Sequence, residues 1–190
     1  MKSLYRIAPN TRTTKRHVIF TEGVQKKLEE IIWENVNEKK IDSRWKITGA
    51  AQESYSDSNI EEMDYIPAFT SIPLFSQNFV TQCALEMSAD VDFIPCTIIS
   101  RTKKNHQYYI ARTRRFLSLI NHDETDLKEK ENLLSPVIFN KIQDDFFLAR
   151  DTIQKTMLIA SEELKKMCDR KKINILFFEV KYEKNSDANS

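Results

Sequence analysis

The chain has 190 residues, of which 41% are hydrophobic and 30% charged, a balance typical of a folded globular protein. Only two glycines occur, which excludes the glycine-rich phosphate loops of nucleotide-binding enzymes. The 29 basic and 28 acidic residues leave a net charge of +1, so no overall field directs the protein to nucleic acid or to a membrane.

The cysteines and the N-terminus bear on the compartment. Cys83, Cys96 and Cys168 are odd in number and far apart, which argues against a disulfide framework and for a reducing environment. The first residues lack the apolar core of a secretory signal, and no apolar run approaches the roughly 20 residues of a spanning helix. We therefore expect a cytoplasmic protein whose three cysteines pack in the core.

The first third is predicted to hold one helix and one acidic loop. Residues 1–16 are basic and irregular, and a short apolar piece follows at 17–20. Thr21 can cap a helix whose apolar positions share one stripe: Val24, Leu28, Ile31 and Ile32. A short strand is predicted at 44–47. Residues 52–65 contain acidic side chains, several serines and no basic residue, which indicates a loop.

The rest of the chain reads as strands in hairpin succession with two further helices. Ser76 and Ser161 are good helix N-caps. The segment 91–100, a basic turn and the segment 107–112 form a predicted hairpin, in which Pro95 requires an edge or a bulge. Further strands are predicted at 116–120, 136–142, 145–149, 156–159 and 173–182. The fold class is α+β, a mainly antiparallel sheet with a few packed helices and an N-terminal helical extension.

No local pattern indicates a cofactor or a metal centre. His17, His106 and His122 lie in different segments, and no His-x-x-x-His or Cys-x-x-Cys pair occurs. The most enzyme-like place is His122 beside Asp123 and Glu124, because carboxylates with a histidine can perform acid–base chemistry. A capped acidic turn is the favoured interpretation of these residues. We expect no enzyme activity, no cofactor and no metal.

A basic hairpin raises the alternative of nucleic-acid binding. Its cations surround Tyr108 and Tyr109: Arg101, Lys103, Lys104, Arg112, Arg114 and Arg115. Aromatic rings interleaved with cations are typical of single-strand nucleic-acid platforms. Strand alternation, however, places the two tyrosines on opposite faces, so they cannot form one stacking surface. A solvated hairpin is favoured, and nucleic-acid binding or a regulatory role is the second hypothesis.

Several short motifs, taken in order, carry a resemblance to a known family. They read SIPLFSQNFVTQCALE, VDFIPCTI, YYIARTRRFLSLINHDETD and DFFLARDTIQKTMLIASEELKKMCDRKKINILFFEV, all within residues 64–180. The order resembles bacterial immunity proteins encoded beside polymorphic toxins, formerly a domain of unknown function. The chain departs from the pattern at Asn174, where the family often has glycine, and at Asp126.

The resemblance implies a function in interbacterial competition. A protein of this family would bind and neutralise a cognate secreted toxin, encoded by a neighbouring gene, by occluding or distorting its active site. It also implies three regions: a variable N-terminal part, 1–63, packed on the main domain; an immunity-type α+β domain, 64–182; and a disordered tail, 183–190. The sequence predicts neither the toxin nor the oligomeric state.

Two surfaces are candidates for toxin binding. The first is the acidic arm with its tyrosines: Glu53, Tyr55, Asp57, Glu61, Glu62, Asp64 and Tyr65. If the toxin is a nuclease, these carboxylates can mimic phosphates in its basic groove. The second is the basic hairpin, which would suit an acidic toxin face. The sequence does not choose between them, and a solvated flexible loop is the favoured interpretation of the first.

Overall fold

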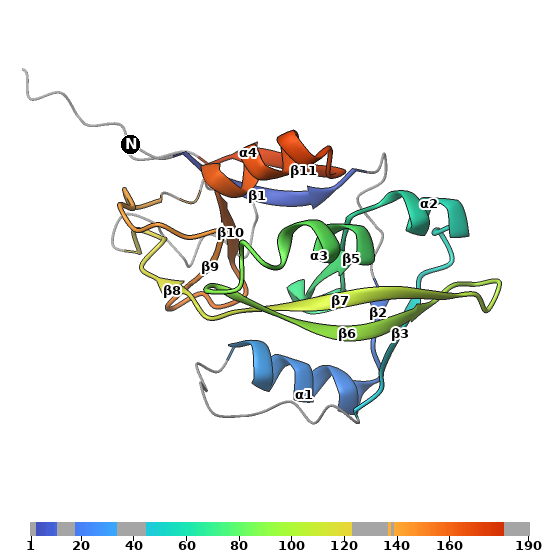
Figure 1. The fold of residues 1–190 in the computed structure, drawn as a ribbon. Helices are drawn as coiled ribbons and strands as arrows, with labels where there is room; N and C mark the ends of the chain where they lie inside the picture. The colour runs from blue at the N-terminus through green and yellow to red at the C-terminus, as the bar shows by residue number, and fades with distance from the viewer. Residues whose placement is uncertain (1–2, 11–17, 34–44, 123–136, 138, 181–190) are drawn as a thin grey trace, which may run out of the picture.

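The computed structural model describes residues 3–10, 18–33, 45–122, 137 and 139–180. These residues form two sheets and four α-helices (Figure 1). Most neighbouring strands in both sheets run antiparallel. The predicted α+β class with mainly antiparallel pairing is confirmed.

The larger sheet has six strands and curls until its two edges nearly meet. In spatial order they are β2 (Val18–Ile19), β3 (Ile47–Ala51), β6 (Val91–Ile99), β7 (Asn105–Thr113), β5 (Pro73–Ser76) and β4 (Tyr65–Pro67). Val18 bridges Ala68, the residue that follows the last strand in this order. Gly49 is required beside this seam, because a Cβ there would come within 2.6 Å of Val18 Cγ1. The sheet is therefore an almost closed barrel.

The predicted hairpin is confirmed as β6 and β7, the two longest strands (Figure 1). They pair along their full length, and residues 100–104 form the turn. Pro95 faces Tyr109 of β7, whereas the parallel ladder with β3 begins only at Cys96. Strand β6 is not at an edge of the sheet, but at Pro95 it pairs with β7 only. The missing N–H of Pro95 therefore disrupts no ladder with β3.

Three helices lie where the sequence predicts them: α1 (Glu22–Trp33), α3 (Gln77–Cys83) and α4 (Glu162–Lys171). The two predicted serine caps are confirmed. The Ser76 hydroxyl accepts the N–H of Phe79 at 3.0 Å, and the Ser161 hydroxyl accepts that of Leu164 at 3.2 Å. The fourth helix, α2 (Asp57–Glu62), falls in the segment predicted as a loop, so that prediction is wrong.

Both faces of the β6–β7 hairpin contribute buried residues, and these belong to different cores. In Figure 1, α1 lies on one side of the hairpin and α3 on the other. Even-numbered residues such as Ile94 and Ile110 pack with the apolar stripe of α1. Odd-numbered residues such as Phe93 and Ala111 pack with α3, α4 and the second sheet. Strand alternation thus joins the two halves of the molecule through one wall.

The second sheet has five strands in the order β11 (Ile175–Glu179), β1 (Leu4–Pro9), β10 (Leu158–Ser161), β9 (Leu148–Asp151) and β8 (Phe116–Leu117). The prediction that residues 1–16 are irregular is wrong for β1. This strand comes from the region assigned to the N-terminal part, and it pairs on both sides with strands from the C-terminal part. Its partners lie more than 150 residues away, so no local signal identifies it.

Of the other predicted strands, 116–120 and 173–182 contain β8 and β11, whereas the rest are displaced or absent. The segments 44–47, 145–149 and 156–159 correspond to β3, β9 and β10, each shifted a few residues toward the C-terminus. The strand predicted at 136–142 is wrong for the described part, where Phe139 makes an isolated bridge only. A short 3-10 helix, η1 (Phe69–Ser71), connects β4 to β5. The predicted tail, 183–190, lies outside the described residues.

Candidate functional site

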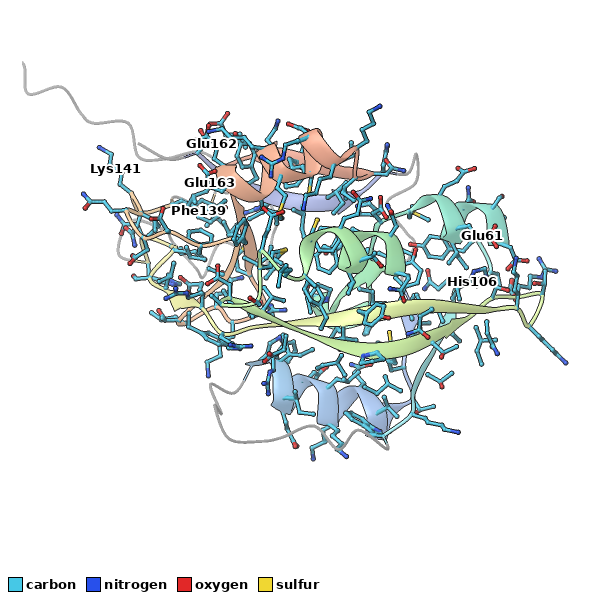
Figure 2. The ribbon with its side chains drawn as sticks, viewed as in Figure 1. Glu61, His106, Phe139, Lys141, Glu162 and Glu163 are labelled. Atoms are coloured by element: carbon cyan, nitrogen blue, oxygen red, sulfur yellow. The ribbon has the colours of Figure 1, made fainter. Side chains whose placement is uncertain are left out.

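A polar groove of about 440 Å³ lies between α2, the start of α3 and the first half of β7. Carboxylates, amides, a lysine and a histidine line it, among them Glu61, Glu62, Asn78, Lys104 and His106. In Figure 2 the labelled Glu61 and His106 lie close together, at the end of the hairpin beside α2. The groove therefore joins the acidic arm to the basic hairpin, which the sequence offered as separate surfaces.

The acidic arm forms a helix because backbone groups at its ends have hydrogen-bond partners and one of its faces is buried. The Ser56 hydroxyl accepts the N–H of Asn59 at 3.1 Å, which caps the N-terminus. Asp57 stands in the first turn, where a negative charge complements the helix dipole. Ile60 is fully buried against the barrel. One of the serines that suggested a loop, Ser56, is thus the cap residue of a short helix.

Asp57 ties this helix to the hairpin turn. Its carboxylate accepts the Thr102 hydroxyl at 2.6 Å and pairs with Nε2 of His106 at 2.9 Å. Hydrogen bonds from Ser100, Thr102 and His106 lower the pKa of Asp57 to about 2. Because an ionised carboxylate only accepts, His106 carries a proton on Nε2.

Tyr108 fixes the other end of α2. Its hydroxyl lies 2.7 Å from the carbonyl oxygen of Ile60 and 2.6 Å from that of Met63, and it donates its proton to this pair. Burial raises the pKa of Tyr108 well above its ordinary value. Tyr109 points the other way, toward the side chain of Gln77, so the predicted opposite placement of the two tyrosines is confirmed.

Three of the predicted toxin-binding residues are not on the surface. Tyr55, Asp64 and Tyr65 are buried, so the expectation that they belong to an exposed arm is wrong. The Asp64 carboxylate accepts the Ser76 hydroxyl and, at 2.8 Å, the backbone N–H of Asn174. It connects β4, α3 and the start of β11. Asp64 therefore fixes the positions of these segments relative to one another beside the groove.

Glu53, Glu61 and Glu62 remain as exposed carboxylates of the first candidate surface. Glu61 forms an ion pair with Lys104 from the hairpin turn, and this hydrogen bond raises the pKa of the lysine. Lys104, which the sequence assigned to the second candidate surface, therefore pairs with a residue of the first.

The basic residues of the hairpin divide into two groups at its opposite ends. Arg101, Lys103 and Lys104 are at the turn and exposed, whereas Arg112, Arg114 and Arg115 follow from the far end of β7. Arg112 and Arg114 both pair with Asp92, and Arg115 pairs with Asp90 at 2.8 Å. The predicted basic surface is thus not continuous, and half of its cations are matched by aspartates.

His122 takes part in a structural network. Its Nε2 lies 2.9 Å from Asp151, whose buried carboxylate also accepts backbone N–H groups from Leu119, Ile120, Ile153 and Gln154. Burial opposes the charge of Asp151, but these bonds outweigh it and lower the pKa of the carboxyl. Asp123 and Glu124, the other members of the predicted acidic turn, lie outside the described residues, as does His17.

The sequence did not indicate that Arg150, the third of the four residues of β9, would be fully buried. Its guanidinium donates to the backbone carbonyls of Lys155 at 2.8 Å and Thr156 at 3.3 Å, and burial lowers its pKa to about 10.

The three cysteines are buried, as predicted, and burial raises the pKa of Cys83 to about 11 and that of Cys96 to about 12. Within the described ranges, no group of three or more His, Cys, Asp or Glu side chains could hold a metal ion. No helix in these ranges has the length and apolarity to cross a membrane.

The sequence matches no protein-family model, and no curated protein matches it significantly. The resemblance to immunity proteins therefore stays a prediction.

Proposed function

We propose that the protein is an immunity protein that binds and neutralises a toxin, and that the groove beside α2 receives the toxin. The observation that supports this is the fixed position of the acidic helix. Asp57 anchors its first turn to the hairpin and Tyr108 anchors its last turn, so Glu61 and Glu62 are presented on a rigid edge of the groove.

Rigidity favours this proposal because ordering a loop on binding consumes part of the interaction energy. Fixing the backbone of one residue costs about 1–2 kcal/mol. In α2 the backbone is already ordered by its cap, by buried Ile60 and by the two anchors. A partner that meets this surface does not have to order it.

The lining indicates which side chains of the toxin would enter the groove. Glu61 and Glu62 supply negative charge, while Asn78 and Gln107 each supply a side-chain amide group. Lys104 neutralises part of the charge of Glu61, so Glu62 is the carboxylate most available to a partner. An arginine or lysine suits this chemistry, because a guanidinium or ammonium pairs with carboxylates and donates to amide oxygens. A toxin with a basic substrate groove, such as a nuclease, offers such residues.

The test is co-expression with the product of the adjacent gene, followed by calorimetry of the purified pair. We expect that product to be lethal alone and harmless with this protein, and Glu62→Lys to weaken binding about tenfold or more. Glu163→Lys is the matched control, because Glu163 is an exposed helical glutamate that lies across the molecule from Glu61 in Figure 2.

Two results would count against the proposal in different ways. If the two charge reversals weaken binding equally, the groove is not the contact surface. If the adjacent product neither kills nor binds, the immunity function itself is wrong.

A further inference from the structure

The edges of the two sheets differ in how well they are protected from pairing with another strand. Edge strands β2 and β8 have two residues each. The edge strand β4 ends in Pro67, and the next residue bridges to β2, which nearly closes the barrel. Short strands, prolines and closure are the usual means of protecting an edge. Among the described strands, these three edges are poor templates for a further strand.

The fourth edge, β11, lacks these protections. Its five residues read Ile-Leu-Phe-Phe-Glu, with no proline or lysine, and they pair with β1 in one unbroken register. Phe178 is 56% exposed although it is aromatic. Among the described residues, β11 has a neighbouring strand on one side only. A continuous apolar edge of this kind accepts another strand readily.

The register with β1 determines which backbone groups face the open side. The Val180 N–H donates to the Leu4 carbonyl at 2.9 Å, which makes this a hydrogen-bonded pair. Because such pairs alternate in an antiparallel ladder, Phe178 and Leu176 also bond toward β1. The N–H and carbonyl groups of Phe177 and Glu179 therefore point away from β1.

We propose that β11 pairs antiparallel with β11 of a second copy of this chain, about a two-fold axis at Phe177. Phe177 then exchanges both backbone hydrogen bonds with Phe177 of the second copy. The Glu179 N–H of each copy donates to the Ile175 carbonyl of the other. The Ile175 N–H keeps its bond to the Ile173 carbonyl, so no bond within either copy is broken.

The side chains of β11 fit this self-pairing. On one face, Phe178 lies directly opposite Leu176 of the second copy, in a pair without hydrogen bonds, where side chains approach most closely. Symmetry repeats this contact, so both exposed phenylalanines are covered. The two Glu179 carboxylates lie about four residues apart along the strands, roughly 14 Å, which is beyond the Debye length at physiological salt. A two-fold interface of this kind is self-complementary.

The inference does not depend on the proposed toxin binding, since it concerns another part of the molecule. Its test is sedimentation of the full chain from about 1 μM to about 1 mM, a range that spans moderate to weak association. We expect a concentration-dependent dimer. Glu179→Pro removes the N–H that points to the second copy but no bond to β1, so it should give a monomer. Glu179→Ala keeps that N–H and, because it also loses the side-chain contact with Ser3, it is the matched control.

Oxidative cross-linking tests the register. The double variant Leu176→Cys with Phe178→Cys should form a covalent dimer, because the two positions face each other at about 4.5 Å between Cα atoms. Phe178→Cys alone should not, since its equivalent in the second copy is two residues away. The three native thiols are buried and do not compete.

Any of three outcomes would overturn the inference. They are a wild-type chain that stays monomeric over the whole range, a Glu179→Pro variant that dimerises like Glu179→Ala, and equal cross-linking of the single and double cysteine variants. The first of these outcomes includes a monomeric chain whose β11 is occupied by a strand of a different protein instead.

Discussion

Replacing Tyr108 by phenylalanine tests whether α2 is held in place from its C-terminal end. Tyr108 is 3% exposed, and its hydroxyl lies within hydrogen-bond distance of the carbonyls of Ile60 and Met63, two buried residues. The variant loses one hydrogen bond, about 1 kcal/mol net, and leaves buried carbonyl oxygen without a donor, which costs about 1–3 kcal/mol more. We expect a total loss of about 2–4 kcal/mol. For a chain of this size that corresponds to a fall in Tm of about 4–16 °C.

Tyr109→Phe is the matched control for this experiment. The two tyrosines are adjacent in β7, but the Tyr109 hydroxyl donates to the exposed side chain of Gln77. Its removal should cost less than about 0.5 kcal/mol, as is usual for surface substitutions. Thermal melts and urea titrations of both variants measure the difference. Equal losses, or no loss for Tyr108→Phe, would refute the reasoning that this hydroxyl anchors the helix.

Two further predictions concern the aspartates beside the groove. Asp64→Ala removes a buried carboxylate that accepts hydrogen bonds from Ser76, Asn78 and the backbone of Asn174, so we expect its free energy of unfolding in urea to fall by about 3 kcal/mol. Asp64→Asn keeps an acceptor oxygen and should lose less. Equal stability of the wild type and both variants would contradict this role of Asp64. The pKa of Asp57 is lowered from 3.8 to about 2, so its stabilising contribution is present above about pH 4 and is lost as the pH falls toward 2. The Tm difference between wild type and Asp57→Asn should therefore shrink across that interval. A constant difference would show that the ionised carboxylate of Asp57 does not stabilise the folded protein.

Local signals in the sequence were sufficient for the hairpin and for three of the helices. Alternating β-branched and aromatic residues identified β6 and β7, and the hydroxyls of Ser76 and Ser161 identified two helix starts. These elements are specified by residues within a few positions of one another. β1 is different, because its two partner strands lie at the other end of the chain and its own six residues carry no strong pattern. Only long-range pairing makes it a strand.

The candidate site was predicted in part, for the same physical reason. The cluster of carboxylates between residues 53 and 64 was visible as composition, and Glu61 and Glu62 do lie at the groove. Composition could not reveal that Asp64 points inward to Ser76. Nor could it show that Lys104, assigned to a competing surface, is the ion-pair partner of Glu61. These contacts join segments more than ten residues apart, so they depend on how the barrel closes.

The closure of the barrel also changes what the acidic residues can do. A free acidic loop would attract cations of any arrangement, because its carboxylates could follow the partner. In α2, Asp57 is committed to His106 and Thr102, and Glu61 is partly neutralised by Lys104. Negative charge is therefore concentrated near Glu62, on a helix whose two ends are held by hydrogen bonds. Such a surface selects partners by the position of one or two cations, and a partner whose cations are displaced by a few ångströms gains little from its charge alone.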